Sequence, residues 1–335
     1  MATDIVNHYS RDGFVGSGAH LTRPNYGPAY SRIDGTYAPR RLDYFSGATG
    51  KTDPSRLPEP ILAGDGVTIS VSRRQSAMPF STKNVIGDEV HYVVGGKGRI
   101  KTDFGVLDCK GGDFILIPRA VGYRIVKIAE TLETIVVSTP GELTIDPFPP
   151  RGVLNVGHAV SMPEIDAGPP AGDETFEMVF RHQGGTTSHF YDFDPLDIAT
   201  VAGPSPVKCF NIDTVRSFSV SEGGMPPPRL INDNTDRTLF FHLGSRRSDR
   251  PPIHVNADYD ELIVYAAGPA SYGAMDVAGQ MAWVPKGIPH HGAEEDTPEP
   301  YQAWLVETRA SLQLTEPGAA ISHLMETGRY GIKQD

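Results

Sequence analysis

The sequence DELIVY at residues 260–265 is followed by GQMAWVP at residues 279–285. The same order of residue types occurs earlier in the chain, as DEVHYV at residues 88–93 and GDFILIP at residues 112–118. In each copy an acidic pair opens an apolar run, and a glycine precedes a second apolar run that ends at a proline. Short runs of this kind between turn residues predict β-strands, and two copies of one arrangement predict an internal duplication.

The sequence around these runs also favours short strands. VTISVS at residues 67–72 alternates between apolar and polar residues, which is typical of a half-buried strand. The 36 glycines and 29 prolines among 335 residues disfavour a helical bundle and favour strands joined by loops. We therefore expect an all-β protein with two barrels. GGKG at residues 95–98 is expected to form a hairpin turn, because no helical pattern follows it.

The duplication divides the chain into five predicted segments. The first is rich in Gly, Pro, Tyr and Arg and predicts an extended arm that packs on its own domain or on a partner chain. The last is expected to hold a short packing helix, from Pro317 to Gly328, and a tail. The segments are an N-terminal arm (1–60), an N-terminal barrel (61–150), a proline-rich connecting segment (151–205), a C-terminal barrel (206–315), and the helix with its tail (316–335).

Composition argues against several classes of function. The net charge of −11 disfavours nucleic-acid binding, which requires a basic face. The sequence has no apolar run of about 18 residues, so we expect no membrane span. The first residues do not form a basic and apolar leader, and Cys109 and Cys209 lie in unlike contexts. We therefore expect no disulfide bond and a cytoplasmic location.

The second copy of the repeat contains a pattern of metal-ligating residues. His254 and Asn256 are two positions apart on an expected strand, so both side chains face the same side. Glu261 opens the next strand, and His290 follows the proline that ends the later one. Two imidazoles and one carboxylate on an interior face form the ligand set that suits non-haem Fe(II). Asn256 is expected to be a fourth ligand or a supporting group.

Several neighbouring residues compete for these roles. His291 is an alternative to His290, but adjacent residues on a strand face opposite sides, so only one of them is expected to bind the metal. Asp258 and Asp260 are alternatives to Glu261, although the repeat favours Glu261 and places both aspartates in a solvated turn. His242 and His291 are candidates for an acid–base residue.

These segments resemble the cupin motifs, His-x-His-x4-Glu followed by Pro-x-Gly-x2-His. Asn256 replaces the second histidine, whereas residues 285–290 match the closing motif in full. The first copy keeps Asn84 and Glu89 but has Thr82 and Tyr123 at the places of the two histidines. The resemblance therefore implies a bicupin of two jelly-roll barrels, in which the N-terminal barrel binds no metal and serves as a scaffold or an interface.

Over about residues 60–310, the chain resembles the homogentisate dioxygenase branch of bicupins. Its shorter length and its arm make it more similar to the large subunits of two-component hydroquinone 1,2-dioxygenases. The resemblance implies an Fe(II) enzyme that inserts O2 into a hydroquinone-type ring to give 4-hydroxymuconic semialdehyde. It also implies a small cupin-like partner subunit in an α2β2 assembly.

Three other functions remain open. A homogentisate or gentisate dioxygenase would need a basic residue for the substrate carboxylate, for which Arg246 and Arg250 are candidates. A cupin isomerase would use Zn or Mn without O2, and the ligand pattern does not exclude it. A metabolite-binding bicupin would have the same fold, with packed histidines and no requirement for iron.

Overall fold

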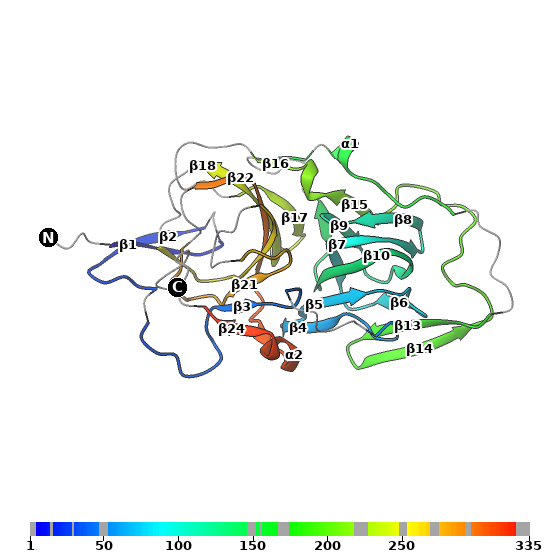
Figure 1. The fold of residues 1–335 in the computed structure, drawn as a ribbon, viewed down its shortest axis with the longest axis horizontal. Helices are drawn as coiled ribbons and strands as arrows, with labels where there is room; N and C mark the ends of the chain where they lie inside the picture. The colour runs from blue at the N-terminus through cyan, green and yellow to red at the C-terminus, as the bar shows by residue number, and fades with distance from the viewer. Residues whose placement is uncertain are drawn as a thin grey trace.

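The described chain forms two β-barrels that lie side by side (Figure 1). The computed structural model describes residues 5–13, 16–28, 30–46, 53–145, 152–154, 156–166, 174–217, 227–247, 253–268, 275–291 and 296–325. Strands dominate these residues, and the helices are single short turns. The predicted all-β architecture with two jelly-roll barrels is confirmed.

The N-terminal barrel is built on a sheet of 11 described strands. Its long strands β7 and β10 pair with each other, and shifts of register along the pair bend them around the barrel. The strands are β4 (Glu59–Gly64), β5 (Val67–Arg74), β6 (Ser81–Asn84), β7 (Asp88–Thr102), β8 (Gly105–Lys110), β9 (Asp113–Ile117), β10 (Gly122–Thr139), β13 (Phe176–His182), β14 (Gly185–Tyr191), β15 (Lys208–Asn211) and β23 (Gln313–Leu314).

The C-terminal barrel is built on a sheet of eight described strands, next to a smaller sheet of three. The sheet of eight contains β3 (Arg40–Leu42), β11 (Leu143–Ile145), β17 (Arg229–Asp233), β18 (Thr238–Arg247), β20 (Asp260–Ala267), β21 (Met281–Val284), β22 (Asp296–Thr308) and β24 (Ser322–Leu324). The smaller sheet contains β1 (Ile5–Ser10), β2 (Gly18–Arg23) and β19 (Ile253–Asn256). The remaining elements are the pair β12 (Gly152–Val153) and β16 (Arg216–Ser217), the helices α1 (Val156–Ala159) and α2 (Glu316–Ala320), and the 3-10 turn η1 (Ile212–Thr214).

The two barrels share equivalent hydrogen bonds at the start of one strand. Asp88 opens β7, and its carboxylate accepts from the backbone N–H groups of Arg119, after the proline that follows β9, and of Leu143 (2.8 Å each). Asp260 opens β20, and its carboxylate accepts from the equivalent groups of Lys286 and Leu312 (3.1 Å each). Buried backbone donors need such partners, so these aspartates join distant segments in both barrels. The predicted duplication is therefore present in the register of the fold.

Alternation along the strands separates three apolar clusters. Residues one position apart on β7 and β9 face either the interior of the N-terminal barrel or the other barrel, as Ile115 and Phe114 do. Trp304 of β22 packs in the shared layer, with its ring centroid 5.0 Å from that of Tyr92 and 5.4 Å from that of Phe114. The shared layer therefore holds the barrels together, and each barrel also has its own interior cluster.

Strands from the predicted arm and connecting segment belong to the barrels. In the arm, β3 pairs with β21, and β1 pairs with β19, so the arm packs on its own chain. In the connecting segment, β13 and β14 form a hairpin that extends the N-terminal sheet. Conversely, β23 near the end of the chain pairs with β4 of the N-terminal barrel. The strand pairs therefore cross the bounds of the predicted segments. Long-range pairs leave no local pattern in the sequence from which these pairs could be predicted.

One hairpin flanks each barrel, and the two hairpins are equivalent. In each, one strand runs parallel to a short barrel strand: β13 beside β6, and β1 beside β19. The hydrogen bond from Val85 N–H to the Arg181 carbonyl (3.0 Å) has its counterpart from Ala257 N–H to the Ser10 carbonyl (3.0 Å). The hairpins β1–β2 and β13–β14 lie at opposite ends of the molecule (Figure 1).

Two local predictions were wrong. GGKG at residues 95–98 is not a turn but lies inside β7, where Gly96 has a positive φ of 86°. A Cβ at Gly96 would lie 1.9 Å from the carbonyl oxygen of Thr131, so glycine permits this close approach of strands. The C-terminal helix is also shorter than predicted, because α2 ends at Ala320 and β24 follows it.

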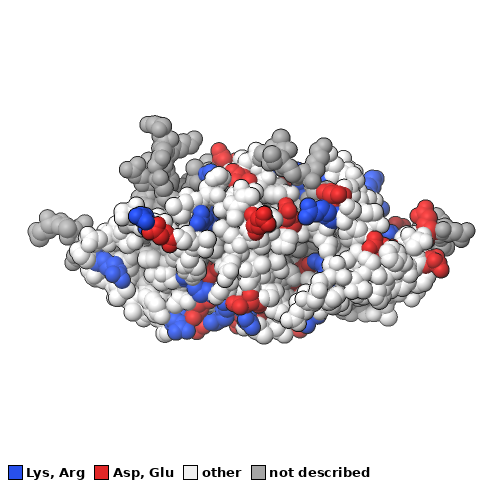
Figure 2. Space-filling view, turned by 90° about the horizontal axis from the view of Figure 1, so that it is seen from below, with Lys and Arg blue, Asp and Glu red and all other residues white. Residues whose placement is uncertain are grey.

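The structure shows where the charged side chains and the cysteines considered in the sequence analysis lie. In the view of Figure 2, basic and acidic side chains are interspersed, and the basic ones do not gather in one field. Cys109 and Cys209 are both buried and free. Among the described residues, no helix has the length and apolar character needed to cross a bilayer.

Gly96 provides a test of the close strand approach. Gly96→Ala and Gly203→Ala both place an L-residue at a φ close to +87°, but a Cβ at Gly203 meets no atom within 4 Å. We expect Gly203→Ala to cost about 1–2 kcal/mol of unfolding free energy from backbone strain. Gly96→Ala should cost about 1–3 kcal/mol more from overlap with the neighbouring strand. Urea unfolding measures both values, and equal losses would contradict the close approach.

Candidate metal centre

His254 and His290 face each other across a short backbone bridge. His254 lies on β19, and each of the two residues donates its backbone N–H to the carbonyl of the other, at 2.7 and 3.0 Å. Their ring centroids are 4.2 Å apart. Directly paired residues present their side chains on the same face, so the bridge brings the two imidazoles together.

Glu261 completes the group. It lies on β20, and its Oε2 atom is 3.5 Å from Nε2 of His290. One ligand atom from each of His254, Glu261 and His290 lies within 4.8 Å of the other two. Within the described part of the chain, this is the group of His, Cys, Asp and Glu residues whose atoms converge in this way. The three residues singled out by the sequence are therefore brought together.

The protonation of His290 suits a metal ligand. Its Nδ1 atom lies 2.9 Å from the carbonyl oxygen of Ile288 and must donate there, because a carbonyl only accepts. In the neutral imidazole, the form that binds a metal, Nε2 then carries the lone pair. This buried atom makes no hydrogen bond with any residue that the structure describes. Buried polar atoms rarely stay unpaired, so a cation bound at Nε2 fits the observed donor set.

The electrostatics of the group favour a charged Glu261. Burial alone would raise the pKa of Glu261, but the close contact with His290 and its charge, with the charge of His254, bring the pKa below its usual value. Burial alone would lower the pKa of His290, but Glu261 and the Ile288 carbonyl raise it. The carboxylate and the imidazoles thus stabilise one another in a site with little solvent.

Asn256 is held by two hydrogen bonds beside this group. Its Nδ2 donates to Oε1 of Glu307 (3.3 Å), and its Oδ1 accepts from the backbone N–H of Tyr259 (3.2 Å). Asp258 and Asp260 do not join the ligand group. Asp258 pairs with Arg11 of the arm, and Asp260 is buried, so the predicted solvated turn is wrong for Asp260.

Glu307 is a functional candidate that the sequence did not reveal. It lies directly opposite Glu261 in the β20–β22 pair and is 1% exposed. Burial, and then the charge of Glu261, raise the pKa of Glu307 well above its usual value. Its place inside the apolar run WLVET at residues 304–308 carries no motif, and the equivalent residue of the first repeat is Ser138. Only the strand pairing could identify it.

The arm adds a second pair of histidines. His20, His8 and His254 lie directly opposite one another on β2, β1 and β19, and His290 faces His254 on the other side. The rings of His8 and His20 are 4.1 Å apart between centroids. Burial, and then the charge of His20, lower the pKa of His8. A row of imidazoles therefore runs from the arm to the ligand group.

The other histidine candidates lie elsewhere. His291 is buried, and its Nε2 is hydrogen-bonded to the hydroxyl of Tyr26 in the arm. His242 lies opposite Trp304, on the face of the sheet that points to the shared core and away from Glu261. Arg250 and the side chain of Arg246 lie outside the described residues.

The same positions converge in the N-terminal barrel. Thr82 lies opposite Tyr123 in the β6–β10 pair, as His254 lies opposite His290. Asn84 donates to Ser138 (2.9 Å), as Asn256 donates to Glu307. The alignment of the two repeats made from the sequence therefore agrees with the alignment of their strand pairs. The chain has a bicupin fold.

Comparison with known proteins extends only to overall architecture. No family model matches the sequence. A cupin 2 conserved barrel domain protein from Leptotrichia buccalis is similar over 84% of this chain and 98% of its own, with 13% identity and a TM-score of 0.41. A variant of oxalate decarboxylase from Bacillus subtilis is similar over 86% of this chain and 80% of its own, with 11% identity and a TM-score of 0.42.

Removing one imidazole tests the ligand group of the C-terminal barrel. We expect His290→Ala to lower the metal content from about one ion per chain to almost none, because it removes the buried Nε2 lone pair. The matched control is Tyr123→Phe at the equivalent position of the N-terminal barrel, which should leave the metal content unchanged. Elemental analysis after anaerobic loading with Fe(II) measures both, and circular dichroism confirms folding. Full metal content in His290→Ala would contradict the assignment.

Substitution of Asp260 tests whether its carboxylate positions the loop that leads from Lys286 to His290. Asp260→Asn places an amide N–H2 group where a carboxylate now accepts from Lys286 and Leu312. The displaced loop should weaken metal binding by about tenfold or more, as loss of an outer support does. Asp88→Asn makes the same change in the N-terminal barrel and should reduce stability while metal affinity stays unchanged. Calorimetric titration with Co(II) compares the two, and equal affinities would contradict this role.

Proposed function

We propose that this chain is the iron-bearing subunit of a ring-cleaving dioxygenase that acts on hydroquinone-type aromatics. The observation that carries the proposal is the group of two imidazoles and one carboxylate, in which the buried Nε2 atom of His290 makes no hydrogen bond and lies 3.5 Å from Oε2 of Glu261. Three protein ligands on one face leave coordination positions for a substrate oxygen and for O2. The resemblance to the hydroquinone dioxygenase large subunits supports the choice of reaction.

The residues around the ligands set the charge of the site. Bound Fe(II) would supply a Lewis acid that favours a deprotonated substrate hydroxyl and a position where O2 can react. Glu261 supplies one negative charge, and burial beside Glu261 raises the pKa of Glu307, which favours the neutral form of that carboxyl. In that neutral form Oε2 would carry the proton, because Oε1 accepts from Asn256.

The supporting residues fix the geometry of the ligands. Asn256 connects Glu307 to the backbone of Tyr259, so we assign it a supporting role beside the ligand strand. The arm covers the same region, since its turn at Gly13 places a hypothetical Cβ only 2.8 Å from Oε2 of Glu307. Tyr26 reaches His291 from the same arm. These contacts cover one side of the site and limit the access of water to it.

The proposal includes a small cupin-like partner subunit in an α2β2 assembly. The described part of the arm already packs on the C-terminal barrel, so the partner would use another surface. Phe190 and Phe193 are exposed at 67% and 61% near the β13–β14 hairpin. Exposed aromatic side chains are frequent in protein interfaces and support this location.

The reaction gives a direct test. The chain, loaded anaerobically with Fe(II) and supplied with the small subunit, should consume one O2 for each hydroquinone. The product should be 4-hydroxymuconic semialdehyde, which keeps both oxygen atoms and requires no external reductant. His290→Ala should lose the activity, and Tyr123→Phe should retain it. An oxygen electrode and mass spectrometry of the product provide the measurement.

Other outcomes would identify the competing functions. Oxidation of homogentisate or gentisate with no turnover of hydroquinone would contradict the substrate but keep the chemistry. Turnover without O2 on a Zn or Mn centre would favour an isomerase. A folded chain that binds no metal with its small subunit present would overturn the enzyme proposal and favour metabolite binding.

A further inference from the structure

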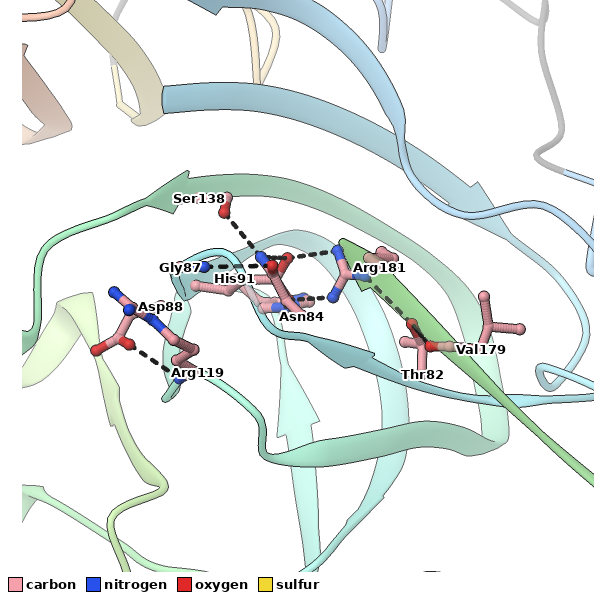
Figure 3. Close-up of polar contacts among 10 residues, drawn as sticks. Thr82, Asn84, Gly87, Asp88, His91, Arg119, Ser138, Val179 and Arg181 are labelled. Atoms are coloured by element: carbon pink, nitrogen blue, oxygen red, sulfur yellow. Dashed lines mark hydrogen bonds and ion pairs between the residues drawn. The ribbon is translucent and has the colours of Figure 1, made fainter. Parts of the chain in front are cut away.

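A buried ion pair fills the interior of the N-terminal barrel. Glu89 is 1% exposed, and the guanidinium of Arg181 contacts both carboxylate oxygens, with Nη1–Oε1 at 2.6 Å and Nη2–Oε2 at 2.9 Å. His91 Nε2 lies 3.2 Å from Oε2 of Glu89. Figure 3 shows this network, with Arg181 reaching in from β13. The contacts of Glu89 hold its pKa well below the usual range although burial opposes this, so the pair is fully charged.

The guanidinium contacts every position that corresponds to a metal ligand. Glu89 is the counterpart of Glu261 and accepts two of its hydrogen bonds. Thr82 is the counterpart of His254, and its Oγ1 accepts from Nε of Arg181 at 3.2 Å. The third position is Tyr123, the counterpart of His290. Its ring centroid lies 5.9 Å from the central carbon of the guanidinium. The guanidinium therefore occupies the place that the cation would take in the C-terminal barrel.

Strand register identifies the residue equivalent to Arg181 in the other barrel. Arg181 lies opposite Asn84 in the parallel β13–β6 pair. Ser10 lies opposite Asn256 in the parallel β1–β19 pair. Paired residues face the same side, so Ser10 and Arg181 extend toward equivalent places. A serine side chain is too short to reach Glu261 as Arg181 reaches Glu89.

We propose that this hairpin position, together with the ligand positions, determines which barrel binds a divalent cation. Arg181 fills the N-terminal centre with a guanidinium, whereas Ser10 leaves the C-terminal centre open to a metal ion. The inference rests on the metal-binding part of the proposed function and not on ring cleavage. The physical reason is that one buried carboxylate needs one cationic partner, and a second cation at the same place would be repelled.

Ser10→Arg tests the inference in the complete chain. The new guanidinium should pair with Glu261 and lower the affinity for Co(II), used as the probe metal, by at least about 100-fold, since a like charge then occupies the site. Tyr9→Arg is the matched control, because it adds the same charge to the same strand on the opposite, exposed face. It should bind Co(II) like the wild-type chain. Calorimetric titration and elemental analysis give affinity and stoichiometry.

The reciprocal change tests the N-terminal barrel. The triple variant Arg181→Ser, Thr82→His and Tyr123→His should bind two Co(II) ions per chain in place of one. Arg181→Ser alone should lower the melting temperature by about 10 °C, because it leaves Glu89 buried without a partner. Adding Glu89→Gln should restore most of this loss. The control is Arg99→Ser, which breaks the exposed, similarly bidentate Arg99–Asp108 pair and should change the melting temperature little.

The outcomes separate the inference from the proposed function. Unchanged Co(II) affinity in Ser10→Arg, or equal losses in Ser10→Arg and Tyr9→Arg, would overturn the inference while the metal site stands. A folded triple variant with one Co(II) would also overturn it. If the triple variant does not fold, Ser10→Arg decides alone. A wild-type chain that binds no Co(II) would overturn the metal site and the inference together.

Discussion

Each barrel buries a carboxylate near its centre, and a buried carboxylate is stable only beside positive charge or several donors. Glu89 and Glu261 occupy equivalent positions, each directly after the aspartate that ties distant segments of its barrel together. The N-terminal barrel meets the requirement with Arg181. The C-terminal barrel offers two imidazoles, one with an unpaired buried nitrogen. The scaffold and the proposed chemistry both follow from how this charge is balanced.

The sequence was sufficient for those parts of the fold that repeat. The acidic pair, the glycine and the closing proline each have a fixed structural task, so they recur at matching positions of β7 and β20 and of the strands that follow. This made it possible to align Thr82 with His254 and Tyr123 with His290, and the strand pairs have the same alignment. Hydrogen-bonding requirements of local backbone are visible in a sequence because few residue types satisfy them.

The sequence was insufficient where the site depends on distant pairing. Arg181 and Glu307 lie beside the buried carboxylates, and His8 lies opposite His254, on strands whose partners are far away in the chain. The parallel pairs of Arg181 and His8 leave no turn motif. Asp260 looked solvated because it sits beside other acidic residues, yet its carboxylate accepts from buried backbone donors and the indole of Trp283. Gly96 looked like a turn, whereas close packing of two strands is what requires it. These features belong to the three-dimensional arrangement and not to any window of sequence.

The differences between the barrels concern charge rather than shape. Asn84 and Asn256 keep the same orienting role, and the flanking hairpins pair in the same register. The interior positions that differ are those that carry charge or proposed metal ligands. The equivalent pairs, N-terminal barrel first, are Thr82 and His254, Tyr123 and His290, Ser138 and Glu307, and Arg181 and Ser10. The C-terminal barrel has no guanidinium at this place but has two imidazoles and a further carboxyl group. A fixed internal cation is thus replaced by ligand atoms that a bound metal ion can occupy. Both arrangements use one hydrogen-bonded framework, so the ion pair of one barrel and the proposed metal centre of the other require no difference in strand order.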